Sequence, residues 1–394
     1  MKKVLVYLNS GNLRAMGGPL GYNYNLREGF DTIEHEELCI DYLPGKSINT
    51  EIRDSVNRIK SKKLKAIFNA LKSILNKTLL RLGLNKKNSV DFSQYDAVHF
   101  HKTEDMYAVR KKLKSYKGKV LLTSHTPTKP SIEAMDKLSA FEKKFLPYIV
   151  TTLERMDDYA FSRADYLVFP CEEAEEPYYN NWNKYEQFKS ENKDKFKYVP
   201  TGTMPIHAKI EKSDMRKKFG IPEEAFVISY VGRHNEIKGY ERLKNVCLDL
   251  INSNENVYAL VAGNQGPLYA PDHNRWIEVG WTDDPGSVIN ASDMFVLPNK
   301  ETYFDIVMLE VLSLGQIVLA SNTGGNKFFK QFSESGIFIF EDDTRLKQTA
   351  NQLMSKSENE LKKLRLLNRK IYEENFTIDR FAKKYVDLYL SILK

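Results

Sequence analysis

Short apolar runs alternate along the chain with longer stretches in which apolar residues recur at helical spacing. The short runs have the length of strands and are often followed by Gly, Pro or Asn. They predict strands at Lys3–Leu8, Ala97–His101, Lys119–Thr123, Tyr166–Pro170, Phe226–Gly232, Val257–Gly263, Trp276–Val279, Met294–Pro298, Ile317–Ala320 and Ile337–Phe340. Strands that alternate with helices are typical of parallel sheets with helices on both faces, so the predicted fold class is α/β.

A segment rich in Pro and Gly separates the first four predicted strands from the others. Lys197–Pro205 contains two prolines and one glycine, and we place a hinge near Pro200. A chain of 394 residues is also long for one core. The sequence therefore predicts two Rossmann-like, doubly wound domains, residues 1–200 and 201–375. Such domains bind ligands at the carboxyl ends of their strands, so we expect the two to face each other across a cleft.

The end of the chain shows no strand pattern. Residues 357–394 predict two helices divided near Asn375–Ile378, and the second of them, within residues 376–394, is amphipathic. At the other end, the first apolar run stops at Asn9 without the small-residue cleavage site of a signal peptide. We interpret that run as a buried strand of the first domain.

The composition is that of a globular protein. Hydrophobic residues make up 42% of the chain, and no run approaches the roughly 20 apolar residues of a membrane span. Cys39, Cys171 and Cys247 are isolated and odd in number, which fits the reducing cytoplasm better than a disulfide framework. Their spacing predicts no structural zinc site.

Much of the net charge of +7 comes from one segment. Residues 57–88 contain ten Lys or Arg and no acidic residue, and their apolar residues recur near the helical repeat. Two interpretations stay open: a helix that lies on an anionic membrane surface, or a surface helix whose apolar stripe joins the core. Nucleic acid is not predicted as a partner, because no recognition module accompanies the charge.

The most informative stretch follows the predicted strand that ends at Pro298. A polar loop comes first, Ile306–Leu314 then carries apolar residues at helical spacing, and a further strand leads to Gly324-Gly325. Strand, loop, helix, strand and glycine turn in this order predict a nucleotide pocket. Glu310 lies in the first turns of the helix, where its two acceptor oxygens suit the two hydroxyl groups of a ribose.

Two cations and one glycine-rich turn are candidates for binding phosphate. Arg233 ends a predicted buried strand and Lys238 precedes the next helix, so both can reach one diphosphate and stabilise it as a leaving group; the alternative is two surface charges. In the first half, Gly17, Gly18 and Gly21 lead into a helix whose N-terminus suits a phosphate, although Gly-Gly-Pro is also an ordinary turn. These glycines lack the dinucleotide-binding spacing.

These motifs together resemble the signature of the GT-B glycosyltransferases of the family-4 type. The motifs are Gly232-Arg233 with Lys238-Gly239, the acidic loop before Glu310, and Gly324-Gly325. The resemblance implies that the second domain binds a nucleoside diphosphate sugar, with Arg233 and Lys238 on the diphosphate and Glu310 on the ribose. It further implies that the donor site includes the loop residues Thr302, Tyr303, Phe304, Asp305 and Ile306, and that Trp281 lies where relatives bind the base.

One position departs from the family pattern. The family's first acidic residue in the Glu-x7-Glu motif contacts the donor sugar, and Thr302 stands in its place here. Glu301 lies one position earlier, and Asp305 occupies a usual glycine position. Either is a candidate for the missing carboxylate.

Three histidines lie in or after predicted strands of the first half. Family members often carry a histidine at the place of His125, near the donor sugar and the acceptor oxygen, so His125 is the candidate for orienting or polarising the reacting groups; the alternative is a structural histidine. His99 and His101 alternate along one predicted strand and are expected on one face of it, as packing or acceptor-site residues rather than metal ligands.

The resemblance implies an activity and a place in the cell. The expected reaction moves a hexose or N-acetylhexosamine unit to a glycan or lipid-linked glycan, with retention of configuration and without a metal or another cofactor. The expected setting is bacterial surface polysaccharide or glycoconjugate synthesis, by a cytoplasmic enzyme at the inner face of the membrane whose final helix packs back on the first domain. Because of Thr302, the alternative is an inactive relative that binds glycan or assists another glycosyltransferase.

Overall fold

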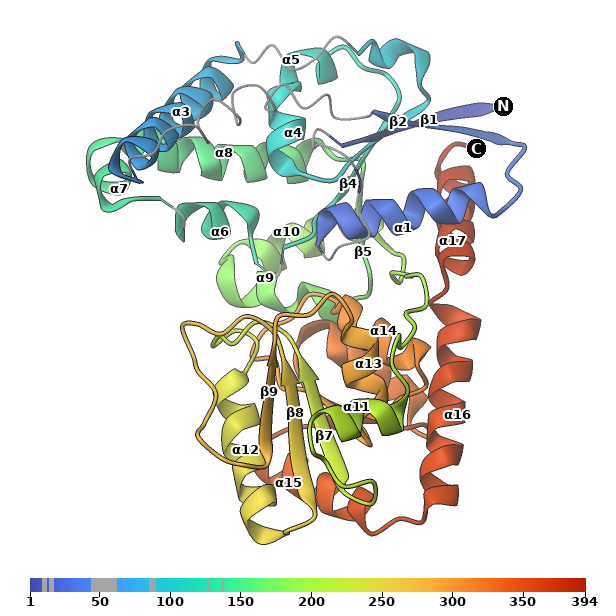
Figure 1. Ribbon diagram of the computed structural model, residues 1–394. Coiled ribbons are helices and arrows are strands. Elements are labelled where there is room, and N and C mark those ends of the chain that lie inside the picture. Colours follow the sequence, from blue (N-terminus) through green and yellow to red (C-terminus); the bar gives the residue numbers. More distant parts are fainter. Residues whose placement is uncertain (9–12, 14–17, 44–61, 85–89, 127, 137) are drawn as a thin grey trace. The chain divides into compact units, whose positions relative to one another are not determined.

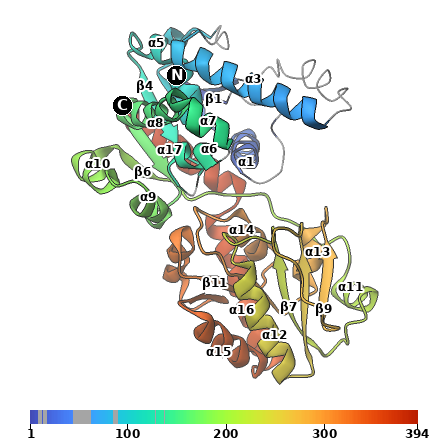
Figure 2. The same ribbon diagram turned by 90° about the vertical axis from the view of Figure 1, so that its left-hand side faces the viewer.

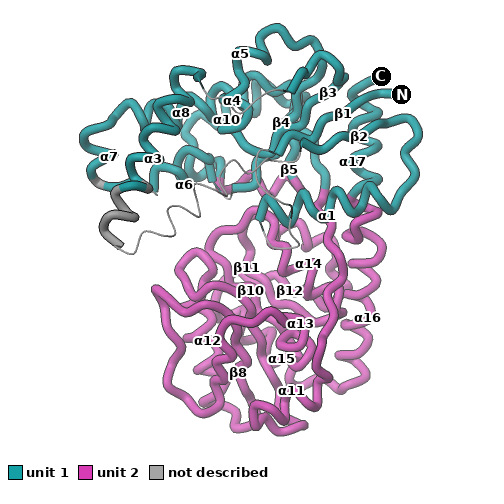
Figure 3. The backbone as a smooth tube through the Cα atoms, turned by 45° about the horizontal axis from the view of Figure 1, so that its top comes forward, with its two compact units in different colours: residues 1–169, 178–199, 382–394 teal, residues 170–177, 200–381 magenta. Residues whose placement is uncertain are grey.

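The computed structural model describes residues 1–8, 13, 18–43, 62–84, 90–126, 128–136 and 138–394. The chain forms two compact units, which Figure 3 colours separately. Unit 1 consists of Met1–Phe169, Tyr178–Val199 and Ala382–Lys394, and unit 2 consists of Pro170–Pro177 and Pro200–Phe381. The sequence predicts that new domain segments begin at residues 201 and 376. It does not predict that the short segment Pro170–Pro177 belongs to unit 2.

Unit 1 contains six parallel strands in the order β2-β1-β3-β4-β5-β6. Figure 1 labels β1, β2, β4 and β5 of this sheet. The strands are β1 (Lys2–Tyr7), β2 (Leu38–Leu43), β3 (Ala97–Phe100), β4 (Lys119–Thr123), β5 (Tyr166–Phe169) and β6 (Phe196–Tyr198). Every residue of β3 is buried, and so is every residue of β4 except Lys119. Such burial is expected of inner strands in a parallel sheet that is covered on both faces.

Helices α1, α7 and α8 of unit 1 begin where the sequence provides starting signals. Pro stands in the first turn of α1 and α8, and Ser139 caps α7 in a capping box with Glu142. The helices are α1 (Pro19–Asp31), α3 (Lys62–Leu82), α4 (Thr103–Ala108), α5 (Arg110–Leu113), α6 (Pro130–Asp136), α7 (Ala140–Phe145), α8 (Pro147–Arg163) and α10 (Tyr185–Glu191). Two more span a unit boundary in the chain, α9 (Glu176–Asn181) and α17 (Ile378–Ile392).

Helix α3 occupies most of the described part of the basic segment. Residues 57–61 and 85–88 of that segment lie outside the described residues. Among the described side chains of α3, Leu80 is the buried one, and Ile74 is partly buried beside the same apolar cluster. None of the helices in the described part of the chain combines the length and the apolar composition needed to cross a membrane.

Two cations of α3 contact the rest of unit 1, whereas two of its leucines are exposed. Lys77 Nζ turns inward and lies 3.3 Å from a carboxylate oxygen of Glu142, and Arg81 donates a hydrogen bond to a backbone carbonyl of α8. Leu71 and Leu75 point outward and are 61% and 58% exposed. The interpretation in which the apolar stripe joins the core therefore holds for only part of the helix.

Unit 2 contains a second sheet of six parallel strands, in the order β12-β11-β10-β7-β8-β9. The strands are β7 (Phe226–Val231), β8 (Val257–Ala262), β9 (Trp276–Gly280), β10 (Met294–Leu297), β11 (Val318–Ser321) and β12 (Ile337–Phe340). The helices are α11 (Lys212–Lys218), α12 (Tyr240–Ser253), α13 (Pro285–Asn290), α14 (Ile306–Ser313), α15 (Asp343–Met354), α16 (Glu358–Asn375) and the 3₁₀ segment η4 (Gly324–Phe332).

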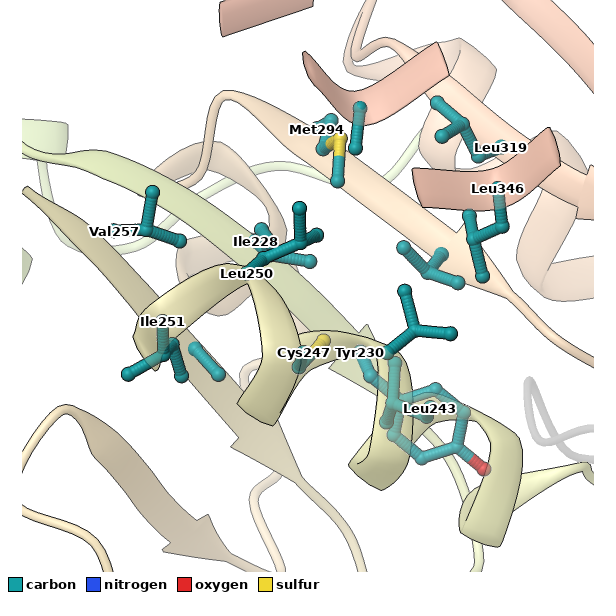
Figure 4. Close-up of a cluster of buried hydrophobic side chains, with 14 of the residues drawn as sticks. Ile228, Tyr230, Leu243, Cys247, Leu250, Ile251, Val257, Met294, Leu319 and Leu346 are labelled. Atoms are coloured by element: carbon teal, nitrogen blue, oxygen red, sulfur yellow. The ribbon is translucent and has the colours of Figure 1, made fainter. Parts of the chain in front are cut away.

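Alternate residues of the unit 2 strands enter cores on opposite faces of the sheet. Ile228 and Tyr230 of β7 pack against Leu243 and its neighbours on α12 (Figure 4), whereas Val227 packs with α11 and α13. Helix α12 accordingly lies on one side of the strands and α11 on the other (Figure 2). Phe295 of β10 enters a third cluster with α14. A sheet that is buried on both faces explains why its strands are continuous apolar runs in the sequence.

The predicted α/β class and all predicted strands are confirmed, with strand ends that differ by at most one residue. The division of the C-terminal stretch into two helices is confirmed as α16 and α17. The prediction misses β2 and β6. Both are edge strands of the unit 1 sheet and are only partly buried, so each has a weaker apolar pattern than an inner strand.

We expect Gly239→Ala to destabilise unit 2 far more than Gly220→Ala. Both glycines have a positive φ, +68° and +66°, so a side chain strains the backbone similarly at either position. A Cβ at residue 239 would lie 1.8 Å from the Pro298 carbonyl oxygen, whereas one at residue 220 meets nothing within 4 Å. Urea unfolding should show an additional loss of at least about 2 kcal/mol for Gly239→Ala. Equal losses would contradict this account of the contact.

Candidate functional site

The carboxyl edge of the unit 2 sheet is built from loops that touch one another. The loops after β7, β10 and β11 follow three neighbouring strands. Lys300 N donates to the Ile237 carbonyl oxygen over 2.9 Å, and Thr323 Oγ1 donates to the Lys300 carbonyl oxygen over 3.0 Å. Each loop is therefore hydrogen-bonded to the next, and their side chains gather at one edge of the sheet.

The Gly324-Gly325 turn packs directly on the loop that contains Thr302. A Cβ on Gly324 would lie 1.9 Å from the Thr302 carbonyl oxygen, and one on Gly325 would lie 2.1 Å from the Tyr303 carbonyl oxygen. Neither position accepts a side chain without a backbone shift. The turn thus sets the course of the loop that leads to α14.

Lys238 and Asp305 form an ion pair across two of these loops. Lys238 Nζ lies 2.6 Å from Asp305 Oδ2, and Asn299 Nδ2 donates to the same oxygen over 2.9 Å. Burial alone would raise the pKa of Asp305, but the charge and hydrogen bond of Lys238 outweigh burial and keep that pKa below its usual value. Asp305 is therefore ionised, and it holds the lysine ammonium in place.

Glu310 lies one turn further along α14, and its pKa is shifted the opposite way. Burial, and then the negative charge of Asp305, raise the pKa of Glu310 to about 7. No residue in the described part of the chain hydrogen-bonds to its carboxyl oxygens. Near neutral pH this group is available both to accept and to donate hydrogen bonds, which suits the vicinal hydroxyls of a ribose.

Arg233 lies in the loop after β7, with its side chain exposed. Its carbonyl oxygen accepts a hydrogen bond from Tyr230 Oη over 2.9 Å. Burial and then the charge of Asp305 raise the pKa of Tyr230, and the charge of Arg233 lowers it. Arg233 and Lys238 both lie between β7 and α12, and Lys238 reaches Asp305, so both cations belong to this edge of the sheet.

The remaining loop residues play different parts. Thr302 is buried, and Glu301 is exposed. The Phe304 side chain packs in the core, with its ring 5.5 Å from that of Phe329, so only its backbone is left for a ligand. Tyr303 and Ile306 are partly buried, and Ile306 begins α14. Of the two candidates for the missing carboxylate, Asp305 is the one built into this edge.

Trp281 follows β9, which is separated from β7 by β8 in the sheet. Its side chain is 67% exposed, so it is not part of the core. The ring is free to stack on a ligand at the same edge of the sheet.

In unit 1, Gly18 is the N-cap of α1, with a φ of +79°. Gly17 and the residues before it back to Asn9, apart from Leu13, lie outside the described residues. The first turn of α1 contains no acidic residue, and its amides are those that the sequence assigns to a phosphate.

His125 forms a pair with a second histidine. His101 Nδ1 and His125 Nε2 lie 2.9 Å apart, and the two rings are nearly parallel, at 14°. The ring of Tyr22 meets that of His125 edge-on, with centroids 4.5 Å apart. His101 lies against His99, with ring centroids 4.4 Å apart, which confirms that the two share one strand face.

Hydroxyl groups fix His99 from both sides. His99 Nδ1 lies 2.8 Å from Tyr389 Oη, and His99 Nε2 lies 2.7 Å from Thr123 Oγ1. Burial first, and then neighbouring charges, lower the pKa of His99 and of His125 to about 3 and also lower that of His101. All three rings are therefore neutral at physiological pH. Among the residues that the structure describes, no three His, Cys, Asp or Glu side chains gather as metal ligands.

Sequence reasoning misses the partners that hold these side chains. Asn299, which bonds to Asp305, gives no signal in the sequence, and neither do Tyr385 and Tyr389, which reach unit 1 from the end of the chain. The partnership of His101 with His125 is different. His101 lies one residue past β3 and His125 two residues past β4, and these two strands are parallel neighbours, so that spacing is a usable signal.

Comparisons with known proteins agree with this fold. Residues 225–356 match the family described as Glycosyl transferases group 1. The O-antigen biosynthesis glycosyltransferase WclY of Escherichia coli is 21% identical over 192 residues, which are 47% of this chain and 52% of WclY. The UDP-Gal:alpha-D-GlcNAc-diphosphoundecaprenol alpha-1,3-galactosyltransferase of Escherichia coli is 26% identical over 199 residues, which are 47% of this chain and 50% of that enzyme. The chain thus spans about half the length of these curated relatives.

Solved structures resemble the whole chain. HepE of Anabaena, in complex with UDP and glucose, has a TM-score of 0.61 at 13% identity and covers 99% of this chain with 100% of its own. Sucrose-phosphate synthase from Thermosynechococcus elongatus has a TM-score of 0.59 at 15% identity, over 100% of this chain and 99% of that one. WaaG, a glycosyltransferase involved in lipopolysaccharide biosynthesis, has a TM-score of 0.56 at 14% identity. The match covers 98% of this chain and 99% of WaaG. These likenesses show the GT-B fold.

We expect acid to destabilise unit 1 through its buried histidines. Unfolded histidine takes up a proton near pH 6.5, whereas folded His99 and His125 do so only near 3, so stability is present above about 6.5 and is lost as the pH falls toward 3. Each such histidine contributes up to about 1.4 kcal/mol per pH unit in that window. Urea unfolding from about pH 7 to about pH 4 should therefore show a shallower pH dependence for His125→Asn. His207→Asn, at an exposed position, is the control, and an unchanged dependence in His125→Asn would refute the assignment.

Proposed function

We propose that the chain, whose residues 225–356 match the Glycosyl transferases group 1 and whose fold is GT-B, transfers a hexose or N-acetylhexosamine unit from a nucleoside diphosphate sugar to a glycan or lipid-linked glycan. Two relatives support an acceptor of this kind by their names, one acting in O-antigen biosynthesis and the other on a diphosphoundecaprenol-linked sugar. The structure of HepE with UDP and glucose supports a nucleotide sugar as the donor. Bacterial surface polysaccharide or glycoconjugate synthesis is the proposed setting.

One observation carries the proposal: the arrangement of charge at the carboxyl edge of the unit 2 sheet. Lys238 and Arg233 supply two cations there, and Glu310 offers a buried carboxyl group with a raised pKa. We assign the two cations to the diphosphate and Glu310 to the ribose. The amide of Ile306, at the start of α14, adds a backbone donor for a phosphate oxygen.

The proposed chemistry uses these cations in the bond-breaking step. As the bond between the sugar and the diphosphate breaks, negative charge grows on the leaving oxygen, and Lys238 and Arg233 stabilise it. The acceptor hydroxyl bonds to the same face of the sugar, and its proton passes to the leaving diphosphate, so the configuration is retained. In this scheme the two cations take the place of a metal ion.

The other assignments complete the proposed donor site. Asp305 supplies the carboxylate that Thr302 lacks, and it accepts a hydrogen bond from a hydroxyl group of the transferred sugar. Lys238 then moves from Asp305 to the diphosphate. Trp281 contacts the base, and Gly18 offers its helix N-terminus to a phosphate. His125 orients the reacting groups.

A second candidate function rests on the same ion pair. Asp305 neutralises Lys238 in the structure, and Thr302 offers no carboxylate. A relative that has lost catalysis and serves as a glycan-binding or assisting partner of another glycosyltransferase would be compatible with both features.

The proposed acceptor would bring the enzyme to the cytoplasmic face of a membrane. Helix α3 supports such a location, because it exposes Leu71 and Leu75 while Lys77 and Arg81 turn inward. Exposed apolar residues in a segment rich in Lys and free of acidic residues suit an anionic bilayer. We therefore propose peripheral membrane binding through residues 57–88.

We expect Arg233→Ala and Glu310→Ala each to lower kcat/KM by at least about tenfold, because each removes a charge-assisted contact to the donor. The measurement is release of nucleoside diphosphate from a panel of UDP-, GDP- and dTDP-hexoses. Lys300→Ala is the matched control, since this cation belongs to the same loops but is half-exposed and paired with Glu236. Unchanged turnover of every accepted donor in both variants would overturn the site assignment. If the native chain turned over no donor yet still bound glycan, the second candidate function would be the correct one.

Binding to vesicles tests the location. We expect the native chain to sediment with phosphatidylglycerol vesicles more than with phosphatidylcholine vesicles, and the preference should weaken as salt is added. Leu71→Gln with Leu75→Gln should weaken binding by about tenfold, because both side chains lose their apolar contact with lipid. Leu366→Gln with Leu367→Gln, at exposed apolar positions in unit 2, is the control. Equal binding of all three proteins would count against residues 57–88 as the contact.

A further inference from the structure

The histidine pair of unit 1 contains one buried nitrogen that lacks a partner. His101 is buried, and its Nε2 has no hydrogen-bond partner among the described residues. Its neighbour His99 cannot supply one, because both ring nitrogens of His99 are already bonded to Tyr389 and Thr123. The other nitrogen of His101, Nδ1, lies 2.9 Å from His125 Nε2.

This arrangement decides which ring donates. A neutral imidazole has one N–H and one bare nitrogen, so exactly one member of the pair donates the hydrogen bond. If His125 donated, His101 would carry its proton on Nε2, as a buried N–H without an acceptor. If His101 donates through Nδ1, its Nε2 is instead a bare acceptor. Buried N–H groups without partners are the rarer of the two, so donation by His101 is favoured.

Donation by His101 also determines the tautomer of His125. Its Nε2 accepts from His101, so its own proton lies on Nδ1, at the other edge of the ring. The Nδ1 of His125 is not among the buried polar atoms that lack a partner, and the residue is partly exposed. A ligand that reaches this edge therefore meets a hydrogen-bond donor and not a bare nitrogen that could take a proton.

We propose that His101 is a positioning residue that holds His125 with its proton on Nδ1, so that His125 acts as a hydrogen-bond donor to an oxygen of the substrate. The identity of that oxygen, on the transferred sugar or the acceptor, rests on the proposed function; the position of the proton does not. Tyr22 supports the same orientation, because its ring packs edge-on against His125 and its hydroxyl is bonded to that of Tyr385. The orientation of the His125 ring is thus fixed by both Tyr22 and His101, and the position of its proton is set by His101 alone.

Two substitutions of His101 separate the hydrogen bond from packing. His101→Asn keeps a donor near the place of Nδ1, whereas His101→Leu fills the space without one. The first measurement is the ¹⁵N shifts of the His125 ring, assigned by comparison with His125→Gln. We expect a bare Nε2 and a protonated Nδ1 in the native chain and in His101→Asn, and a mixture of the two tautomers in His101→Leu. A protonated Nε2 in the native chain, or a tautomer that His101→Leu leaves unchanged, would overturn the proposal.

Turnover of the accepted nucleotide sugar provides the second measurement. We expect His101→Leu to lower kcat by about tenfold or more with little change in the donor KM, because the donor group is no longer held in place, and His101→Asn to restore most of the rate. A loss of equal size in both variants would indicate a purely structural residue and would also overturn the proposal. If His125→Ala itself leaves turnover unchanged, the assigned role of His125 in transfer fails, while the ¹⁵N shifts still decide the part of His101.

Discussion

Contact between the backbones of neighbouring loops is the constraint on which the candidate site depends. Gly239 lies against Pro298, and Gly324 lies against Thr302, at distances that leave no space for a side chain. Because the loops after β7, β10 and β11 are this close, Lys238 from one loop reaches Asp305 from another over 2.6 Å. The polar chemistry of this edge therefore depends on the absence of a side chain at Gly239 and Gly324 as well as on the charged residues.

The carboxylate of Asp305 attracts one neighbouring side chain, Lys238, and repels the charged form of another, Glu310. Asp305 holds the ammonium of Lys238, and its charge helps to raise the pKa of Glu310 to about 7. The edge is consequently closer to charge balance than its two cations suggest. Under the proposed function, a diphosphate would compete with Asp305 for Lys238, and its gain would be smaller than with a free lysine, because one ion pair is lost as another forms.

Sequence patterns predict the fold well because the inner strands of parallel sheets are apolar throughout. They fail at β2 and β6, where an edge position leaves half of each strand in water. The charged residues Arg233, Lys238 and Glu310 stand out because strand, loop and helix are visible around them. Side-chain direction is harder: Phe304 belongs to the loop but packs inward, and Asn299 becomes visible as a partner of Asp305 only once the loops are in place. Contacts between residues so far apart in the chain depend on tertiary packing, which no local pattern encodes.

Unit 1 includes the last residues of the chain, Ala382–Lys394, and its buried His99 is bonded to Tyr389 within them. During synthesis on a ribosome, the strands of this unit emerge before unit 2, but the hydroxyl partner of His99 emerges after it. The usual order, in which an N-terminal domain completes its folding before the next is made, therefore cannot apply in full here. Until Tyr389 has emerged, the first sheet lacks the hydroxyl group that is hydrogen-bonded to His99.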